Sequence, residues 1–157
     1  MFGVYFPEAY IDTNYLLKKD DKVEVIAKVD NNTNNSYRVL FGSKTNNSNQ
    51  DSYFFYTRYS GNTYFAYNKN GGESSSSASV YDTIFKLVTN QTQATWYVDG
   101  IQKGQITRSG TGKDSTYTCW LGCCNSANSV ESYNYCTIYS FKVYESKIGR
   151  ASCRERV

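Results

Sequence analysis

Apolar and polar residues alternate along most of this chain, which is the period of a β-strand and not of a helix. Residues 22–29 (KVEVIAKV) show the pattern most clearly. The apolar residues of one face are Val23, Val25, Ala27 and Val29. Such a run predicts a strand with one face in a core and the other toward solvent. No segment has the three-to-four-residue spacing of an amphipathic helix.

Segments rich in Asn and Ser separate further runs of this kind. Strands are expected at residues 37–42, 52–59, 63–68, 81–89, 94–107, 117–122 and 136–144. Aromatic residues make up 17% of the chain, and they favour strands. Roughly ten short strands at this spacing predict an all-β domain, a two-sheet antiparallel β-sandwich of jelly-roll type.

The strongest local signal is a hairpin within residues 94–107 (ATWYVDGIQKGQIT). Asp99-Gly100 lies between two alternating runs, as a tight primed turn requires, because Gly accepts a positive φ. Alternation places Trp96 with Val98 on the core side. Tyr97 is then expected to point outward.

Several phrases in this order resemble the laminin G-like, concanavalin A-like lectin/glucanase superfamily. They are YIDTNYLLKKDDKVEV (residues 10–25), WYVDGIQKG (96–104), WLGCCNS (120–126) and TIYSFKVYES (137–146). The resemblance covers residues 9–145. Asn14 stands where such domains often have Gly, and Asn also tolerates left-handed backbone. The resemblance implies a concanavalin A-like jelly roll.

The resemblance also implies a non-catalytic binding role, toward carbohydrate or a surface protein, within a larger extracellular, cell-surface or phage protein. It transfers no binding residue, because these domains share a scaffold while their sites vary by loop. Related domains usually continue beyond the last strand, so residues 1–147 are expected to be one domain truncated at its C-terminus. The alternative is a structural or assembly domain of a virion or surface layer.

Residues 148–157 (IGRASCRERV) resemble the translation of a sequencing-library adapter. They are expected to be an artefactual, disordered tail and are set aside from the fold. Without their three arginines and one glutamate, the net charge falls from +3 to +1. This near-neutral balance offers no electrostatic footprint for nucleic acid. No apolar stretch approaches the ~20 residues of a membrane span, so no membrane insertion is expected.

A glycoside hydrolase is the most distant alternative. Glycoside cleavage needs two carboxylates flanking the scissile bond, and glucanases of the superfamily carry them as E-x-D-x-x-E on one strand. No E-x-D occurs in this chain, and there is no His for a Ser-His-Asp arrangement. The prediction is therefore that the protein is not an enzyme.

No cofactor is predicted. Cys119, Cys123, Cys124 and Cys136 match no usual zinc spacing. Three interpretations stay open for them: buried small apolar residues, a disulfide, or a metal site. Calcium is conceivable at a sandwich rim, but the aspartates occur singly and no D-x-D-x-D loop appears.

A sugar site would use aromatic faces against the apolar faces of pyranose rings. The candidate ligand-binding residues are Tyr56, Arg58, Tyr97 and Trp120. In residues 52–59, Phe55 and Tyr53 are expected in the core, with Tyr56 and Arg58 outward. Trp120 falls on the strand face opposite to Cys119 and Leu121, either facing solvent or packed beneath a loop. An Arg beside an outward Tyr can hydrogen-bond a sugar or stack on the ring.

Overall fold

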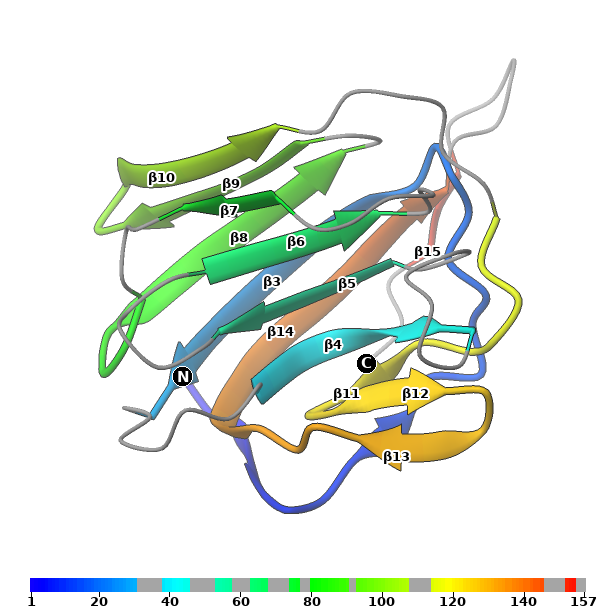
Figure 1. Cartoon of the computed structure of the whole chain (residues 1–157). Helices are drawn as coiled ribbons and strands as arrows, with labels where there is room; N and C mark the ends of the chain where they lie inside the picture. Colours follow the sequence, from blue (N-terminus) through cyan, green and yellow to red (C-terminus); the bar gives the residue numbers. More distant parts are fainter. Residues whose placement is uncertain are drawn as a thin grey trace.

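The computed structural model describes residues 1–30, 38–45, 53–57, 63–67, 74–76, 80–90, 93–107, 114–145 and 152–154. Within these residues every regular element is a strand, and the strands form two sheets that face each other (Figure 1). The predicted all-β, two-layer sandwich is therefore confirmed. No helix in the described ranges is long and apolar enough to cross a membrane.

The first sheet has the strand order β1-β14-β3-β8-β9-β10, and β15 also pairs with β14. Its strands are β1 (Val4–Pro7), β3 (Lys22–Val29), β8 (Ile84–Asn90), β9 (Gln93–Val98), β10 (Ile101–Thr107), β14 (Tyr135–Glu145) and β15 (Ser152–Arg154). All its neighbouring strands are antiparallel. β14 is its longest strand, and it carries a register shift between Ile138 and Ser140.

The second sheet has the order β13-β12-β4-β5-β6-β7. Its strands are β2 (Ile11–Asp12), β4 (Arg38–Lys44), β5 (Tyr53–Thr57), β6 (Thr63–Tyr67), β7 (Ser74–Ser76), β11 (Trp120–Leu121), β12 (Cys124–Ser126) and β13 (Ser129–Glu131). Two short strands, β11 and β12, pair with the same edge of β4. β11 pairs antiparallel with Phe41 and Gly42, and β12 pairs parallel with Ser43 and Lys44. β11 in turn pairs with β2.

The core lies between the two sheets and follows the predicted alternation. β3 has the predicted bounds, and its four apolar residues of one face are completely buried. Trp96 and Phe55 are also fully buried, and their rings meet edge to face with centroids 6.0 Å apart. Both were expected in the core. The side chain of Tyr53 lies outside the described part of the structure.

The turn between β9 and β10 is the one the sequence predicts. Ile101 pairs with Val98, and the intervening Asp99 and Gly100 have φ values of 50° and 75°. Two positive φ values in a two-residue loop match the twist of the strands on either side. Asn14 likewise has a φ of 53°, so the expected left-handed backbone occurs at this position.

One expectation about an extended segment is corrected. The strand expected at 117–122 is reduced to Trp120–Leu121, because Gly122 turns the chain with a φ of 83°. Within residues 148–157, the structure describes Ser152–Arg154 alone, as β15, which pairs with Val143–Glu145 of β14. Pairing to a preformed edge can order three residues whatever their own sequence preference.

Candidate functional site

Five polar and aromatic residues gather where several strands end or begin. Tyr5 and Glu8 come from β1 and the residue after it, Asp30 follows β3, Arg38 opens β4, and Tyr135 opens β14. In Figure 1 the tip of β3 and the starts of β4 and β14 meet at one corner of the sandwich. We call these five residues the tyrosine–arginine cluster.

Contacts within the cluster link it into one network. Tyr5 Oη donates a hydrogen bond to Asp30 Oδ2 at 3.3 Å, and Arg38 Nη1 donates to the Asp30 carbonyl at 3.4 Å. The Arg38 guanidinium lies over the Tyr135 ring, 4.7 Å from its centroid. Tyr135 Oη donates to the Glu8 carboxylate. The backbone supports this arrangement, because the Asp30 N–H donates to the Tyr135 carbonyl at 2.9 Å.

Both tyrosine hydroxyls have a raised pKa. The hydrogen bond to Glu8, followed by desolvation, raises the pKa of Tyr135. Desolvation and the charge of Asp30 raise the pKa of Tyr5. Both hydroxyls are protonated at neutral pH, as an unperturbed tyrosine is, and the raised pKa extends their range as donors to higher pH.

The cluster combines the groups that bind a sugar. Carboxylates accept hydrogen bonds from sugar hydroxyls, the guanidinium donates to ring and hydroxyl oxygens, and Tyr rings offer apolar faces. Tyr5 is 50% exposed, so its ring is available at the surface. The arrangement is suited to binding a polyhydroxylated ligand.

Of the four residues predicted from the sequence, the structure describes the side chains of Tyr97 and Trp120, and these two lie in different sheets. Tyr56 lies on β5 opposite Val39, with its side chain outside the described residues, and Arg58 is outside them altogether. Tyr97 is part-buried on β9, in the other sheet, where its backbone position lies opposite Lys86 and Gln102.

Trp120 does not face solvent. Its side chain is only 7% exposed, and Tyr10 stacks on it with ring centroids 4.2 Å apart and planes 14° from parallel. The expected strand face is right, since Cys119 and Leu121 both belong to the core. The expectation that the Trp120 side chain faces solvent is wrong, because Tyr10, directly before β2, covers its indole. Tyr10, 42% exposed, presents the aromatic surface at this position.

Sequence reasoning missed the tyrosine–arginine cluster. Arg38 and Tyr135 make an Arg–Tyr contact of the kind considered for Arg58 and Tyr56, whose side chains lie outside the described residues. Arg38 and Tyr135 each open a strand directly after a polar, Asn-containing segment. That position at a strand end is the only sequence signal that could have pointed to them.

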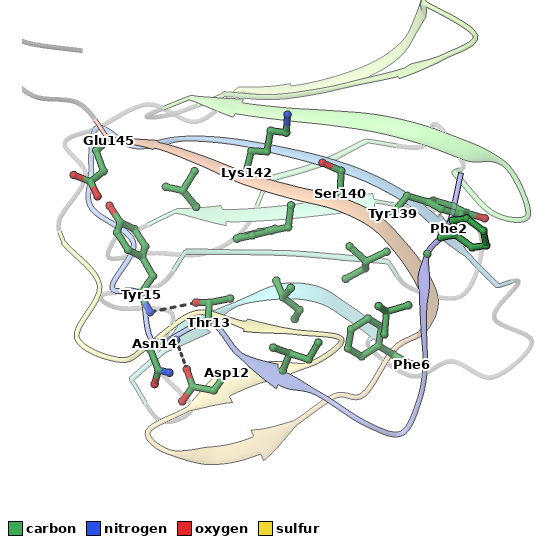
Figure 2. A pocket seen from close by; sticks show the side chains of 17 residues that line it. Phe2, Phe6, Asp12, Thr13, Asn14, Tyr15, Tyr139, Ser140, Lys142 and Glu145 are labelled. Carbon is green, nitrogen blue, oxygen red and sulfur yellow. Dashed lines mark hydrogen bonds between the residues drawn. The ribbon is translucent and has the colours of Figure 1, made fainter. Parts of the chain in front are cut away.

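A second feature is a cleft of about 890 Å³ at one edge of the sandwich, shown in Figure 2. We call it the edge cleft. Its residues come from β1 and the N-terminal end, from 11–15, and from the second half of β14. They are Phe2, Gly3, Val4, Phe6, Ile11, Asp12, Thr13, Asn14, Tyr15, Leu121, Ile138, Tyr139, Ser140, Phe141, Lys142, Val143 and Glu145. Tyr15 and Glu145 lie at one end, and Phe2 and Tyr139 at the other (Figure 2).

The wall formed by residues 12–15 is fixed by hydrogen bonds. The Asn14 N–H donates to Asp12 Oδ1 at 2.8 Å, and the Tyr15 N–H donates to Thr13 Oγ1 at 3.2 Å. Thr13 Oγ1 in turn donates to the Cys119 carbonyl at 2.7 Å. Asp12 therefore has a structural role in its turn.

Cys119, Cys123, Cys124 and Cys136 are buried free thiols. Of the three interpretations, the structure shows the small buried side chain. Desolvation raises the pKa of Cys123 and of Cys136 to about 12, and it also raises the pKa of Cys119 and of Cys124. Among the described residues, no three His, Cys, Asp or Glu side chains lie close enough to hold a metal ion.

No protein-family model and no curated protein matches the chain. Solved structures do match. A point mutant of NanB sialidase from Streptococcus pneumoniae has a TM-score of 0.64 at 19% identity, over 94% of this chain and 26% of that one. The chain thus spans about a quarter of that sialidase.

Two smaller structures resemble it as well. The Ruminococcus gnavus IT-sialidase CBM40 has a TM-score of 0.63 at 13% identity, over 92% of this chain and 90% of that one. Domains LG4-5 of the mouse laminin alpha1 chain have a TM-score of 0.57 at 15% identity, over 97% and 42% of the two chains. At these identities the likeness concerns the fold alone: the chain has a two-sheet jelly-roll fold like that of the laminin and CBM40 structures.

Proposed function

We propose that this protein is a non-catalytic carbohydrate-binding module that binds glycans through the tyrosine–arginine cluster. Its setting would be a larger protein outside the cell, at a bacterial surface or on a phage particle. The observation that carries the proposal is the network joining Tyr5, Asp30, Arg38 and Tyr135 at an exposed corner of a jelly roll.

Two comparisons support a glycan as the ligand. The R. gnavus CBM40 module has been solved bound to α2,3 sialyllactose and to α2,6 sialyllactose, and both complexes have this fold. Within the cluster, donors and acceptors alternate around aromatic rings. A ligand with several adjacent hydroxyls can exchange hydrogen bonds with such a set without leaving any protein group unpaired.

Each polar group has a defined part in this proposal. Asp30 and Glu8 accept hydrogen bonds from sugar hydroxyls, and Arg38 donates to sugar oxygens. Tyr135 supports the guanidinium through the cation–π contact. Tyr5 offers the exposed ring against which a pyranose face can pack.

A glycan array that includes α2,3- and α2,6-sialyllactose, probed with the full chain, tests the function. Variants Tyr5→Ala and Arg38→Lys then test the site, by titration with the best-bound glycan. We expect each variant to weaken binding at least tenfold. Tyr5→Ala removes the exposed ring, and Arg38→Lys replaces the planar guanidinium, which can donate two parallel hydrogen bonds, by a single ammonium group. Tyr97→Ala is the matched aromatic control and is expected to bind as the parent does.

Three results would count against the proposal. Absence of binding to every glycan, with concentration-dependent oligomers on a sizing column, would favour an assembly domain. Binding that survives both cluster variants but is lost in Tyr97→Ala would move the site to the outer face of the first sheet. Release of free sugar from a bound glycan would contradict the non-catalytic role.

The domain limits remain a proposal. We assign residues 1–147 to the module and 148–157 to translated adapter. Resequencing the source DNA after adapter trimming tests this assignment, because a genuine C-terminus would retain the codons for residues 148–157.

A further inference from the structure

We propose that the tyrosine–arginine cluster selects a glycan with free amino groups, a polymer of unacetylated hexosamine, over neutral and acidic sugars. This inference rests on the proposed function, and it names the class of sugar that the same site takes. It starts from the charges that gather at this corner of the sandwich.

Acidic residues outnumber basic residues among the described residues at this corner. The acidic residues are Glu8, Asp30 and Asp82, and the basic residues are Arg38 and Lys28. The Asp82 N–H donates to the Val29 carbonyl at 2.8 Å, which brings this third acidic residue to the end of β3. Lys28 lies on β3 itself, two positions before Asp30. Three carboxylates and two cations leave an excess of one negative charge.

The two tyrosines of the cluster respond to this excess. The pKa of Tyr135 is raised first by its hydrogen bond to Glu8 and then by desolvation and the Glu8 charge. The pKa of Tyr5 is raised first by desolvation and then by the charge and hydrogen bond of Asp30. Arg38 lowers both pKa values, but in each case by less than the carboxylate raises it. The carboxylates therefore dominate the electrostatic field at both hydroxyls.

Hydrogen bonds inside the cluster engage the tyrosine donors and leave carboxylate acceptors. Tyr5 Oη donates to Asp30 Oδ2 at 3.3 Å, and Tyr135 Oη donates to Glu8 Oε1. Within the described residues, no hydrogen bond reaches the second carboxylate oxygens, Asp30 Oδ1 and Glu8 Oε2. Glu8 is exposed and Asp30 is half-buried. A ligand is therefore favoured if it brings donors to these two oxygens.

Strand pairing presents these groups on one face. Phe6 and Cys136 pair with each other, and both are buried. Tyr5 and Tyr135, at the adjacent positions, therefore project from the outer face of the first sheet. The Asp30 N–H donates to the Tyr135 carbonyl at 2.9 Å, which places Asp30 beside Tyr135. The Tyr5 ring, 50% exposed, thus lies next to a carboxylate at the surface.

A protonated amine fits this surface better than a hydroxyl or a carboxylate does. Its N–H groups donate charge-assisted hydrogen bonds to carboxylates, and these are about twice as strong as hydrogen bonds between neutral groups. An ammonium can also lie on the face of an exposed tyrosine ring. The carboxylate of an acidic sugar would instead meet two like charges, Asp30 and Glu8, against the single guanidinium of the cluster.

A hexosamine suits the cluster better than a lysine side chain, which carries the same charge. A pyranose ring brings hydroxyls next to its amine, and its apolar face can pack on the Tyr5 ring. A lysine ammonium offers donors at one point and no acceptor. In a polymer of unacetylated hexosamine every sugar carries an amine, so the polymer can bind in more than one register.

Isothermal titration calorimetry on the full chain tests the preference, at about pH 6 so that sugar amines are protonated. The ligands are the tetramer of glucosamine, the tetramer of N-acetylglucosamine, α2,3-sialyllactose and tetralysine. We expect the glucosamine tetramer to bind at least tenfold more tightly than each of the others. N-acetylation removes the charge and keeps the ring, whereas tetralysine keeps the charges and lacks the ring.

Isosteric variants test the two carboxylates. Glu8→Gln and Asp30→Asn each remove one negative charge and keep an acceptor for the tyrosine hydroxyl. Each is expected to reduce the preference for glucosamine over N-acetylglucosamine at least threefold. Asp20→Asn is the matched control and should keep the preference, since Asp20, 39% exposed, lies before the other end of β3. Because Glu8 is exposed, Glu8→Gln should keep the parent Tm, and it decides the test if Asp30→Asn destabilises the protein.

Failure of this inference is distinguishable from failure of the proposed function. If the N-acetylated tetramer or sialyllactose binds as tightly as the glucosamine tetramer and Tyr5→Ala abolishes this binding, the glycan site stands and the amine preference is overturned. A preference that survives both Glu8→Gln and Asp30→Asn would overturn the role of the carboxylates. Equal binding of tetralysine would show that the site takes cationic chains without regard to the sugar. If no glycan binds, the proposed function and this inference fail together.

Discussion

Gly104 of β10 lies directly against the indole of Trp96 on β9, so closely that a Cβ at position 104 would overlap the ring. Trp96 is fully buried and is one of the largest side chains of the core. The strand pair has a register shift between Gln102 and Gly104, which brings the glycine over the indole. The absence of a side chain at Gly104 is therefore part of the packing of Trp96.

Gly104→Ala is expected to destabilise the protein by about 1–3 kcal/mol, because the added methyl forces Trp96 out of its rotamer. For a domain of this size, that corresponds to a fall in Tm of about 2–4 °C per kcal/mol. Differential scanning calorimetry measures the change. Gln105→Ala, on the same strand and exposed, serves as the control. A Tm for Gly104→Ala equal to that of the control would refute the contact.

The turn between β12 and β13 carries avoidable strain. Ala127 and Asn128 have φ values of 52° and 65°, a region that Asn tolerates and Ala does not. Ala127→Gly is expected to stabilise the protein by about 0.5–1 kcal/mol, the gain being limited by the extra freedom of Gly in the unfolded chain. Urea titration checks this value. Asn128→Gly should have the smaller effect, and the opposite order would contradict the strain argument.

Tyr10 should control the access of solvent to Trp120. Removing its ring in Tyr10→Ala exposes the indole face and loses the stacking contact, worth about 0.5–1.5 kcal/mol. We expect the tryptophan emission to shift to the red and its quenching by acrylamide to increase. Trp96 is fully buried and contributes equally to the signal of both proteins. Tyr5→Ala is the control, since Tyr5 contacts Asp30 instead. Unchanged quenching in Tyr10→Ala would mean that something other than Tyr10 covers Trp120.

The buried thiols predict how stability depends on alkaline pH. The pKa of Cys136 rises from 9.0 to about 12 on burial. Below about pH 9 both folded and unfolded chains keep this proton, so the thiol adds no pH dependence. Between pH 9 and 12 only the unfolded chain loses it. Stability then falls with rising pH, by up to about 1.4 kcal/mol per unit for each such thiol.

Cys136→Ala isolates this effect. The variant loses packing at pH 7.5, but its free energy of unfolding should fall less steeply above pH 9 than that of the parent. Urea titrations at pH 7.5 and 10.5 give both values. The two proteins differ in no other titratable side chain, so the difference between their curves comes from the thiol and from its effect on the pKa of Tyr5. Parallel curves would show that the Cys136 thiol titrates in the folded state as it does in the unfolded chain.

The sequence predicted what depends on local alternation and turn chemistry. The bounds of β3, the inward row from Val23 to Val29, the Asp99-Gly100 turn and the burial of Phe55 all follow from such patterns. These features need no knowledge of which strands are neighbours. For the same reason, β7 was missed, because Ser74–Ser76 have little strand preference and are extended through pairing with β6.

The candidate site could not be predicted in this way. Arg38 and Tyr135 meet only because β14 lies beside β3 and the chain continues from β3 toward β4 at the same corner. Alternation placed Trp120 on the correct strand face, but its burial depends on Tyr10, from a segment far away in sequence. The alternation of apolar and polar residues shows which face of a strand is buried, but it does not show which distant segments will be in contact.

The pairing of Val4 with Ile138 has a consequence for how the protein is made. β14 lies between β1 and β3, so neither of these early strands has its central partner until β14 has been synthesised. Contacts of such long sequence separation slow folding. The nascent chain should therefore keep the edge of β3 open until residue 145 leaves the ribosome, and then fold in one late, cooperative step.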